Sequence, residues 1–251
     1  MKIKVINPNT TASMTQKIGQ AAQAVANPGT KIIACNPEMG PVSIEGYYDE
    51  ALCVVGLLEE IRQGEKEGVD GYVIACFGDP GLLAAREVTR SPVIGIAEAA
   101  MHTASFIATG FSIVTTLRRT RIIAQDLVEK YGMSRFCRNI RAVDLPVLDL
   151  EVSNARKIII QECCQALVED QVGAIVLGCG GMADLAKEIS HEIDAPVIDG
   201  VTAAVKFVEA LVALGLGTSK IGDLAFAIAK PYTGALQTFA YLPANKPTYQ
   251  K

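Results

Sequence analysis

The sequence of 251 residues has no tryptophan, two histidines and no pair of cysteines in Cys-x-x-Cys spacing. His102 and His191 are too few and too scattered for a zinc site. The seven cysteines are an odd set, which favours reduced thiols over a disulfide framework. We therefore expect no metal ion and a reducing compartment.

The sequence also lacks an excess of positive charge and any long apolar run. Its formal net charge is −4, and its one short cluster of basic residues is Arg118–Arg121, which argues against nucleic acid as a partner. The chain starts with the strand-like residues Lys2–Ile6, and no apolar run reaches membrane-spanning length without glycine or charge. These features predict a soluble, cytoplasmic protein without membrane contact.

What the sequence does contain is an alternation of short apolar runs and helical periodicities. Near-continuous apolar strands such as Ala174–Leu177 indicate parallel sheets covered by helices on both faces, so the predicted fold class is α/β. The predicted strands are 2–7, 30–35, 71–76, 92–96, 111–115, 139–144, 173–178 and 196–198. The predicted helices are 11–26, 48–67, 80–89, 98–109, 118–131, 152–170, 181–193 and 201–214.

The two halves of the chain are weakly repeated. Cys76 aligns with Cys179, and one extra residue later Ser91–Gly95 aligns with Ala195–Asp199. We therefore predict two pseudo-symmetric lobes, each a mostly parallel sheet flanked by helices, with the active site in the cleft between them. The first lobe is expected to comprise residues 1–98 and 205–251, whose helix and C-terminal tail return to it. The second is expected to comprise residues 99–204.

Both cysteines and several small polar residues fall at the carboxyl ends of predicted strands. In open parallel sheets, ligands bind beyond these ends. If the lobes face one another, Cys76 and Cys179 approach a single cleft from opposite walls. The residues at these positions are Asn7, Asn9, Cys76, Thr115, Thr116 and Cys179.

A free cysteine is most often a small buried hydrophobe, and this explanation suffices for the other five cysteines. Cys76 and Cys179 lie beside glycines in two matching units, which favours a function. Asp79 and Pro80 predict that a helix begins just after Cys76, with Asp79 as its N-cap. The positive end of that helix could lower the pKa of the Cys76 thiol toward neutrality, although the Asp79 carboxylate opposes this.

Two thiols on opposite faces of one carbon can invert a stereocentre. One, as a thiolate, removes a proton, and the other, as a thiol, delivers a proton to the far face. The carbanion must be delocalised into an adjacent carbonyl, whose oxygen could meet backbone N–H donors in the glycine turns after both cysteines. A lone nucleophilic cysteine would need a base, and His102 and His191 fit packing or surface roles better.

Six segments, in this order, resemble the aspartate/glutamate/hydantoin racemase superfamily. Its members have two similar α/β lobes, a catalytic cysteine from each and no cofactor. The resemblance is closest to hydantoin and allantoin racemases, because the Cys-Asn-Thr and Cys-Thr sequences typical of amino-acid racemases are absent. The segments are Val5–Thr10, Ser43–Glu50, Ala75–Gly81, Gly95–Ala99, Leu177–Met182 and Pro196–Val201.

The resemblance implies cofactor-independent racemisation of 5-monosubstituted hydantoins, with Cys76 and Cys179 as the acid/base pair at ring carbon C5. A hydantoin ring needs no charged anchor, because its neutral amide edges pair with backbone groups and amide side chains. Turn formation, helix capping and surface packing explain most of the other implied residues about as well. The implied ring contacts are the backbone of Phe77, Gly78, Gly180 and Gly181, the side chains of Asn7 or Asn9 with Thr115 and Thr116, and Ser43 with its loop neighbours Ile44 and Glu45 over the 5-substituent.

Several alternatives stay open. The nearest is a racemase dedicated to allantoin in purine degradation. A decarboxylase or cis-trans isomerase of the same superfamily is more distant, as is a non-catalytic two-lobed sensor of small molecules. The apolar helix Ala203–Leu214 suggests a homo-oligomer. Gly215–Lys220 matches no nucleotide-binding motif and predicts a helix stop, and the residues from Ala225 onward are expected to wrap a lobe or a neighbour.

Overall fold

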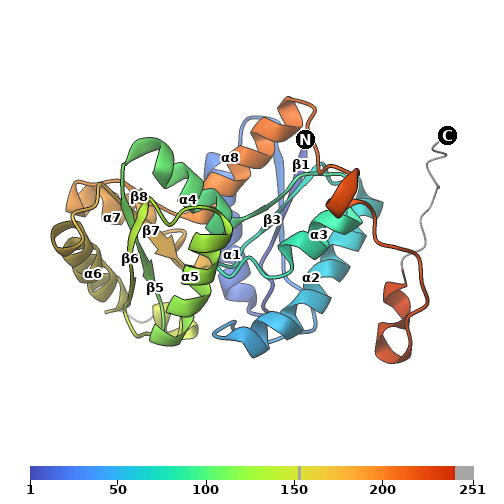
Figure 1. Ribbon diagram of the computed structural model, residues 1–251, viewed down its shortest axis with the longest axis horizontal. Helices are drawn as coiled ribbons and strands as arrows, with labels where there is room; N and C mark the ends of the chain where they lie inside the picture. Colours follow the sequence, from blue (N-terminus) through green and yellow to red (C-terminus); the bar gives the residue numbers. More distant parts are fainter. Residues whose placement is uncertain (152–153, 241–251) are drawn as a thin grey trace.

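Parallel strands form two sheets of the same topology. The computed structural model describes residues 1–151 and 154–240, and within them the strands form two four-stranded sheets, one in each half of the molecule (Figure 1). Every pairing in both sheets is parallel. The first has the order β2-β1-β3-β4, with β1 at Lys2–Ile6, β2 at Lys31–Cys35, β3 at Gly71–Ile74 and β4 at Val93–Gly95. The second has the order β6-β5-β7-β8, with β5 at Phe111–Thr115, β6 at Cys137–Ala142, β7 at Ala174–Gly178 and β8 at Val197–Ile198.

Helices alternate with the strands, so the predicted α/β class with parallel sheets is confirmed. Parallel neighbours require such crossovers, because the chain must return to the same end of the sheet before it re-enters. Helix α2 ends where Gly68 takes a φ of 66°, a left-handed conformation that glycine adopts without steric penalty. In the described residues the α-helices are α1 (Ala12–Val25), α2 (Tyr47–Glu67), α3 (Leu82–Val88), α4 (Ile96–Ile107), α5 (Arg121–Lys130), α6 (Ala155–Glu169), α7 (Ala186–Ile193) and α8 (Gly200–Ala213).

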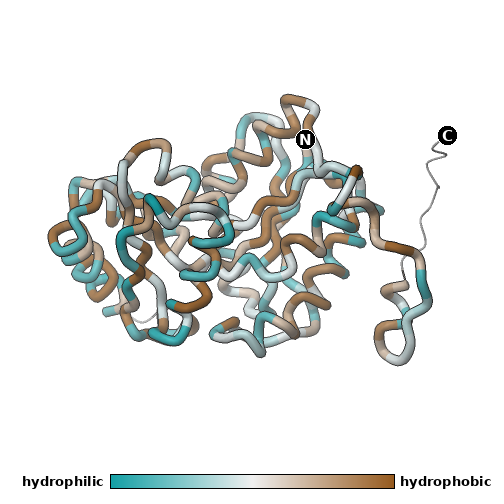
Figure 2. Tube along the Cα trace, in the orientation of Figure 1, coloured by the Kyte–Doolittle hydropathy of each residue, from teal (hydrophilic) through white to brown (hydrophobic). Residues whose placement is uncertain are grey.

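The strands are buried because helices cover both sheets. Every residue of β3, β5 and β7 is buried, and Figure 2 shows hydrophobic stretches of chain in the interior of both halves. One apolar cluster extends from Ile3 of β1 to Val176 of β7. The two lobes therefore share a continuous hydrophobic core, and burial of that core holds them together.

Helices α4 and α8 each cross from one lobe to the other. Helix α4 follows β4 of the first sheet but packs on β7 of the second, whereas α8 follows β8 and packs on β3 and β4. The two helices also pack on each other, with the rings of Phe106 and Phe207 edge to face at 6.3 Å between centroids. The predicted division into residues 1–98 with 205–251 and residues 99–204 assumes an exchange of this kind and stays a prediction.

Several predicted helices begin later than the sequence indicated. The predicted helix 80–89 is α3, whose N-cap is Gly81, so the prediction that Asp79 caps this helix is wrong. The predicted helices 118–131 and 181–193 each open with a separate 3-10 turn, η1 (Arg118–Thr120) and η3 (Gly180–Met182), ahead of α5 and α7. In η3 two adjacent glycines disfavour a regular α-helix.

The chain beyond α8 contacts the first lobe at several points. The predicted helix stop is confirmed, because Gly215 has a φ of 69° and the N–H of Leu216 reaches back to the carbonyl of Leu211 at 2.9 Å. Lys220 Nζ then donates to the carbonyl of Arg86 at the end of α3, and Arg62 of α2 stacks over the ring of Phe239 at 5.0 Å. Residues 241–251 of the predicted tail lie outside the described residues.

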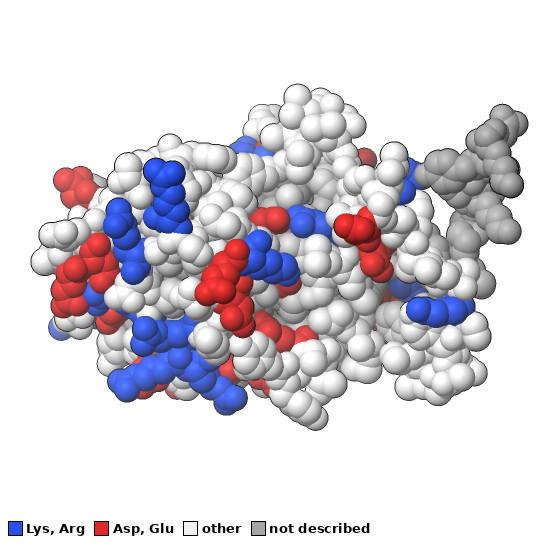
Figure 3. Space-filling model, in the orientation of Figure 1, with Lys and Arg blue, Asp and Glu red and all other residues white. Residues whose placement is uncertain are grey.

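Charged side chains of both signs are interspersed on the face drawn in Figure 3, with one group of basic side chains at the lower edge of the second lobe. This face has no continuous basic surface of the kind that tracks a nucleic-acid backbone. Across the described ranges, every helix is too short or too polar to cross a bilayer.

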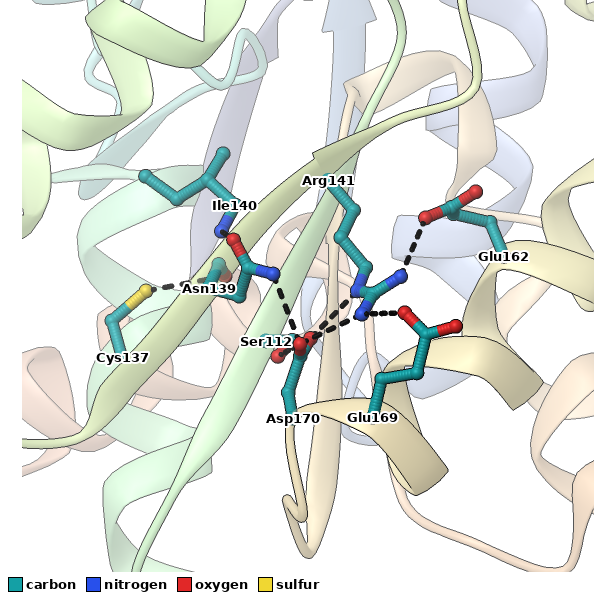
Figure 4. A network of polar contacts seen from close by, with 8 residues as sticks. All are labelled: Ser112, Cys137, Asn139, Ile140, Arg141, Glu162, Glu169 and Asp170. Carbon is teal, nitrogen blue, oxygen red and sulfur yellow. Dashed lines mark hydrogen bonds and ion pairs between the residues drawn. The ribbon is translucent and has the colours of Figure 1, made fainter.

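A network of charges fastens the second sheet to α6 and to Asp170, the residue after that helix (Figure 4). Arg141 of β6 contacts Asp170 at 2.6 Å, Glu169 at 2.6 Å and Glu162 at 3.1 Å. Ser112 of β5 also donates to Asp170 at 2.7 Å. The side chain of Asp170 is 8% exposed, and the hydrogen bonds from Arg141 lower its pKa to about 2. The ionised carboxylate therefore stabilises the folded state.

We expect Asp170→Asn to lower the free energy of unfolding by about 2–3 kcal/mol at pH 7, because it leaves Arg141 without its main partner. The folded-state pKa lies below the ordinary 3.8, so this stabilisation is present above about pH 4 and is lost as the pH falls through about 2. Urea unfolding at several pH values measures this free energy of unfolding. Glu192→Gln, at an exposed ion pair with Arg156, is the control and should change stability by less than about 0.5 kcal/mol. An equal loss in both variants at pH 7 would contradict the expectation.

Candidate active site

The carboxyl ends of both sheets face one small hollow, with a cavity volume of about 50 Å³. Cys76 follows β3 and Cys179 follows β7, and both line this hollow. Its size suits a ligand of few atoms, not a segment of a macromolecule. The lining residues are Asn7, Asn9, Met14, Ile44, Glu50, Ala75, Cys76, Phe77, Gly78, Thr115, Thr116, Thr120, Ile123, Ala124, Val147, Gly178, Cys179 and Gly180.

The main chains that follow β3 and β7 are in direct contact. A Cβ atom placed on Gly180 would lie 2.6 Å from the carbonyl oxygen of Ala75, which is closer than real Cβ contacts come. Only glycine leaves room for this approach. Because Ala75 precedes Cys76 and Gly180 follows Cys179, the contact brings the two cysteines to the same hollow.

The two cysteines sit in matching turns. The carbonyl of Cys76 accepts from the N–H of Asp79 at 3.0 Å, and the carbonyl of Cys179 accepts from the N–H of Met182 at 3.1 Å. Each sulfur also accepts a backbone N–H two residues further on, from Gly78 and from Gly181 respectively. The predicted repeat thus extends to the hydrogen bonds around the sulfur atoms.

Both thiols are hard to ionise in the free protein. Loss of solvent raises the pKa of the Cys76 thiol well above its ordinary value, and it raises the pKa of Cys179 to about 11. One backbone N–H beside each sulfur lowers the thiol pKa, but this effect is smaller than the rise caused by burial. The expectation that a helix lowers the pKa of Cys76 toward neutrality is wrong, because α3 starts six residues after Cys76 and desolvation dominates.

The predicted polar residues reach the hollow, but most of their side chains bond to protein groups. Asn7 donates to Asn9 Oδ1 at 2.8 Å and to Thr15 Oγ1 at 3.0 Å. The hydroxyl of Thr115 donates to the carbonyl of Gly178 at 3.1 Å. The structural roles of these side chains are thus established by the hydrogen bonds, whereas contact with a ligand stays a prediction.

Ser43 and Gly181 do not line the hollow. Of the loop residues expected over the 5-substituent, Ile44 lines the hollow and Ser43 does not. Gly181 is the residue after Gly180, and its N–H donates to the sulfur of Cys179. Phe77, Gly78 and Gly180 line the hollow as expected. The sequence interpretation did not identify Met14, Glu50, Thr120, Ile123, Ala124 and Val147, which also belong to the wall.

Glu50 is the carboxyl group that the sequence interpretation missed. It lies on α2, and its Oε1 occupies the space beside Gly78, only 2.0 Å from where a Cβ on that glycine would be. Burial and the nearby carboxylate of Asp79 raise the pKa of Glu50 to about 7. The segment Ser43–Glu50 carried part of the family resemblance, so the motif contained this residue although only Ser43 and its neighbours Ile44 and Glu45 were assigned a role.

The segment before α2 and the first residue of that helix bridge the two lobes beside the hollow. Glu45 Oε1 accepts the N–H of Val147 at 2.7 Å, and the Tyr47 hydroxyl donates to Asp126 of α5 at 3.0 Å. Ile44 and Val147, from opposite sides of this bridge, both line the hollow. The bridge therefore closes one side of the hollow.

Residues 1–151 and 154–240 contain no group of three or more His, Cys, Asp or Glu side chains that could hold a metal ion. The polar atoms around the hollow are thiols, amides, hydroxyls, backbone N–H groups and one carboxyl group. These groups can transfer protons and bind a small polar ring.

The chain belongs to the Asp/Glu/Hydantoin racemase family, whose model it matches over residues 3–208. It is 52% identical to hydantoin racemase of Pseudomonas sp. (strain NS671) over 241 residues, which are 95% of this chain and 97% of that protein. The solved structure of allantoin racemase from Klebsiella pneumoniae is 59% identical, with a TM-score of 0.95 over 96% of this chain and 100% of that chain. Arylmalonate decarboxylase, 16% identical with a TM-score of 0.59 over 86% of this chain and 94% of its own, shares the fold. The racemase resemblance is confirmed, and the chain is a racemase.

We expect Gly180→Ala to lower stability by about 1–3 kcal/mol and to abolish most racemase activity, because the new methyl group would push the main chain away from Ala75. Gly173→Ala is the matched control, since its Cβ would meet only the Cβ of Ala108 at 3.3 Å. Thermal unfolding and initial rates of optical-rotation change measure the two effects. A Gly180→Ala protein with normal rates would show that the close approach of the strand ends is dispensable.

Proposed function

We propose that the protein racemises 5-monosubstituted hydantoins without a cofactor, through Cys76 and Cys179 acting as two bases at C5. The observation that carries the proposal is the pair of thiols that line one hollow, one from each sheet, each in the same turn with a backbone N–H on its sulfur. The family and its hydantoin-racemising relatives support this reaction.

In the proposed reaction one cysteine is a thiolate and the other a thiol. The thiolate takes the proton from C5, and the C–H electron pair moves into the neighbouring carbonyl to form an enolate. The enolate collapses as the opposite thiol delivers its proton to the other face of C5. The protonation states of the two sulfurs are then exchanged, so the enzyme is ready for the mirror-image substrate.

Backbone N–H groups beside the cysteines can stabilise the enolate oxygen. In the described part of the chain, the N–H groups of Phe77 and Gly180 bond to no protein oxygen, and both residues line the hollow. Gly180 opens the 3-10 turn η3, where the first N–H groups have no partner within the turn. Donors fixed by the main chain need no reorganisation as charge develops.

A high thiol pKa is compatible with this chemistry. A thiolate formed from a thiol of pKa about 11 is scarce at neutral pH, but it is a stronger base toward carbon than an ordinary cysteine. The same exclusion of water that raises the pKa strengthens the hydrogen bonds to the enolate. The two titrations are coupled through the pair, so the activity depends on the protonation state of the pair.

Deuterium exchange at C5, measured in deuterated water, tests this proposal. Each enantiomer of a 5-alkylhydantoin is incubated with wild type, Cys76→Ser and Cys179→Ser, and both deuterium at C5 and optical rotation are followed. Wild type should racemise and incorporate deuterium. Each single variant should lose racemisation by at least about a thousandfold and retain exchange with one enantiomer, opposite in the two variants, because one thiol still faces its proton.

Cys164→Ser is the control for this test, because Cys164 is exposed and away from the hollow. It should racemise at the wild-type rate. Undiminished racemisation by either Cys76→Ser or Cys179→Ser would refute the two-base assignment.

Allantoin is the second candidate substrate, and one observation favours it. Allantoin is a hydantoin ring with a ureido group on C5, and the Glu50 carboxyl group projects into the hollow, where it makes no hydrogen bond to any described residue. A carboxylate there could accept the ureido N–H groups. The similarity to the Klebsiella pneumoniae allantoin racemase structure points the same way.

We expect Glu50→Gln to reduce kcat/KM for allantoin about tenfold, because allantoin would lose a charge-assisted hydrogen bond. The kcat/KM for 5-alkylhydantoins should change less than about threefold, because these substrates make no such bond. In wild type, the preference for allantoin should rise with pH through about 7, as the Glu50 carboxyl group ionises. Chiral chromatography of both substrates measures it. Glu59→Gln, exposed on the same helix, is the control. An equal fall in kcat/KM for both substrates would show that Glu50 does not distinguish them.

We also propose that the protein works as a homo-oligomer in the cytoplasm. The apolar face of α8 packs on α1, α4 and β3 within the chain, so it is not free for a neighbour. Support comes instead from exposed apolar side chains elsewhere, among them Phe106 and Ile107 at the end of α4. Sedimentation velocity of the whole protein tests the assembly.

A further inference from the structure

The two halves of the fold cap equivalent helices in different ways. Helix α8 starts after β8, and its N-cap Asp199 accepts the N–H of Thr202 at 2.9 Å, as a capping aspartate ordinarily does. The aligned residue before α4 is Gly95, which has no side chain. The backbone is nevertheless the same, with φ and ψ of −83° and 146° at Gly95 and −94° and 146° at Asp199.

The missing cap of α4 is supplied by Asp79. Its two carboxylate oxygens accept the N–H groups of Ala97 at 3.0 Å and Glu98 at 2.9 Å. A Cβ on Gly95 would lie 2.2 Å from Asp79 Cγ. The Asp79 carboxyl group thus occupies the space where the side chain of an aspartate at position 95 would be.

This arrangement requires an unusual conformation of Asp79. Its φ is 44°, in the left-handed region that residues other than glycine seldom adopt, and the residue is 3% exposed. A cap from position 95 would need no such conformation, as α8 shows. The strained residue is retained because its carboxylate, held by α4, fixes the segment to which it belongs.

That segment is the turn that carries Cys76. The N–H of Asp79 closes the turn on the carbonyl of Cys76 at 3.0 Å, and the Tyr131 hydroxyl at the end of α5 donates to the same carboxylate at 2.8 Å. The carboxylate therefore joins the Cys76 turn to α4 and to α5 of the second lobe. The turn of Cys179 has no such tie, because the residue matching Asp79 is the fully buried Met182.

We propose that Asp79 is a positioning residue for Cys76, which holds this thiol in register with Cys179 by capping α4 from within the Cys76 turn. The role in racemisation rests on the function proposed above, and the structural part does not. The two cysteines should therefore respond differently to the loss of Asp79. Proton transfer by Cys76 is disturbed, whereas proton transfer by Cys179 stays largely intact.

The decisive variant is Asp79→Gly combined with Gly95→Asp. It gives α4 the cap that α8 has and removes the link to the Cys76 turn. Asp79→Gly alone should lower the melting temperature by about 3 °C or more, and the double variant should recover most of that loss. In the Cys179→Ser background, deuterium exchange by Cys76 should nevertheless stay at least tenfold below that of the parent with Asp79. In the Cys76→Ser background, exchange by Cys179 should change less than threefold.

A second readout needs no turnover. The rate at which iodoacetamide alkylates Cys76 at pH 9, followed by peptide mass spectrometry, should change at least threefold in the double variant and in Asp79→Asn, whereas the rate at Cys179 should not. Asp199→Gly is the matched control, because it removes an equivalent helix cap without touching either cysteine turn. It should lower the melting temperature and leave both rates unchanged.

A double variant with normal stability, normal Cys76 alkylation and normal exchange would overturn the proposal and leave Asp79 as a helix cap alone. If the double variant does not fold, Asp79→Asn decides the question by the same alkylation rates. If wild type exchanges no hydantoin, the proposed function fails, and the alkylation comparison still tests the positioning role.

Discussion

The main chain at Gly180 passes over the carbonyl of Ala75 at a distance that admits no side chain, and the position of both cysteines follows from this contact. Cys76 is the next residue after Ala75, and Cys179 is the residue before Gly180. The spacing of the two sulfurs is thus set by main-chain packing between two sheets, not by flexible side chains. Sheets buried in a shared apolar core deform little, so the geometry of the thiol pair is fixed before a substrate arrives.

In the reaction proposed for Cys76 and Cys179, removal of water from the hollow has two opposite effects. It suppresses ionisation of the thiols, which have no histidine, lysine or arginine beside them in the wall. It also strengthens every dipole that faces the reacting carbon, including the main-chain N–H groups of the two glycine turns. A substrate with a neutral ring suits such a site, because its binding requires no buried charged anchor.

The sequence was informative wherever a local pattern decides the structure. Apolar runs ending in small polar residues predicted the parallel sheets, and the matching segments around Cys76 and Cys179 predicted the shared hollow. Asp79 could not be interpreted locally, because Asp-Pro is a good helix start and its true partners are the N–H groups of a helix that begins later in the chain. Glu50 was missed for a similar reason: its direction depends on how α2 packs over the Cys76 turn. The thiol pKa values depend on burial, which no sequence pattern near the cysteines encodes.

The crossed packing of α4 and α8 has a consequence for the history of the fold. A polypeptide ending after α4 would contain one complete sheet, yet that helix packs on β7 of the other sheet. Such a half-length ancestor could cover its helix only by pairing with a second molecule, each lending a helix to the other. The present chain has the form of such a helix-swapped dimer joined end to end. In one chain the two halves can carry different residues at matching positions, such as the glycine at position 95 and the aspartate at position 199.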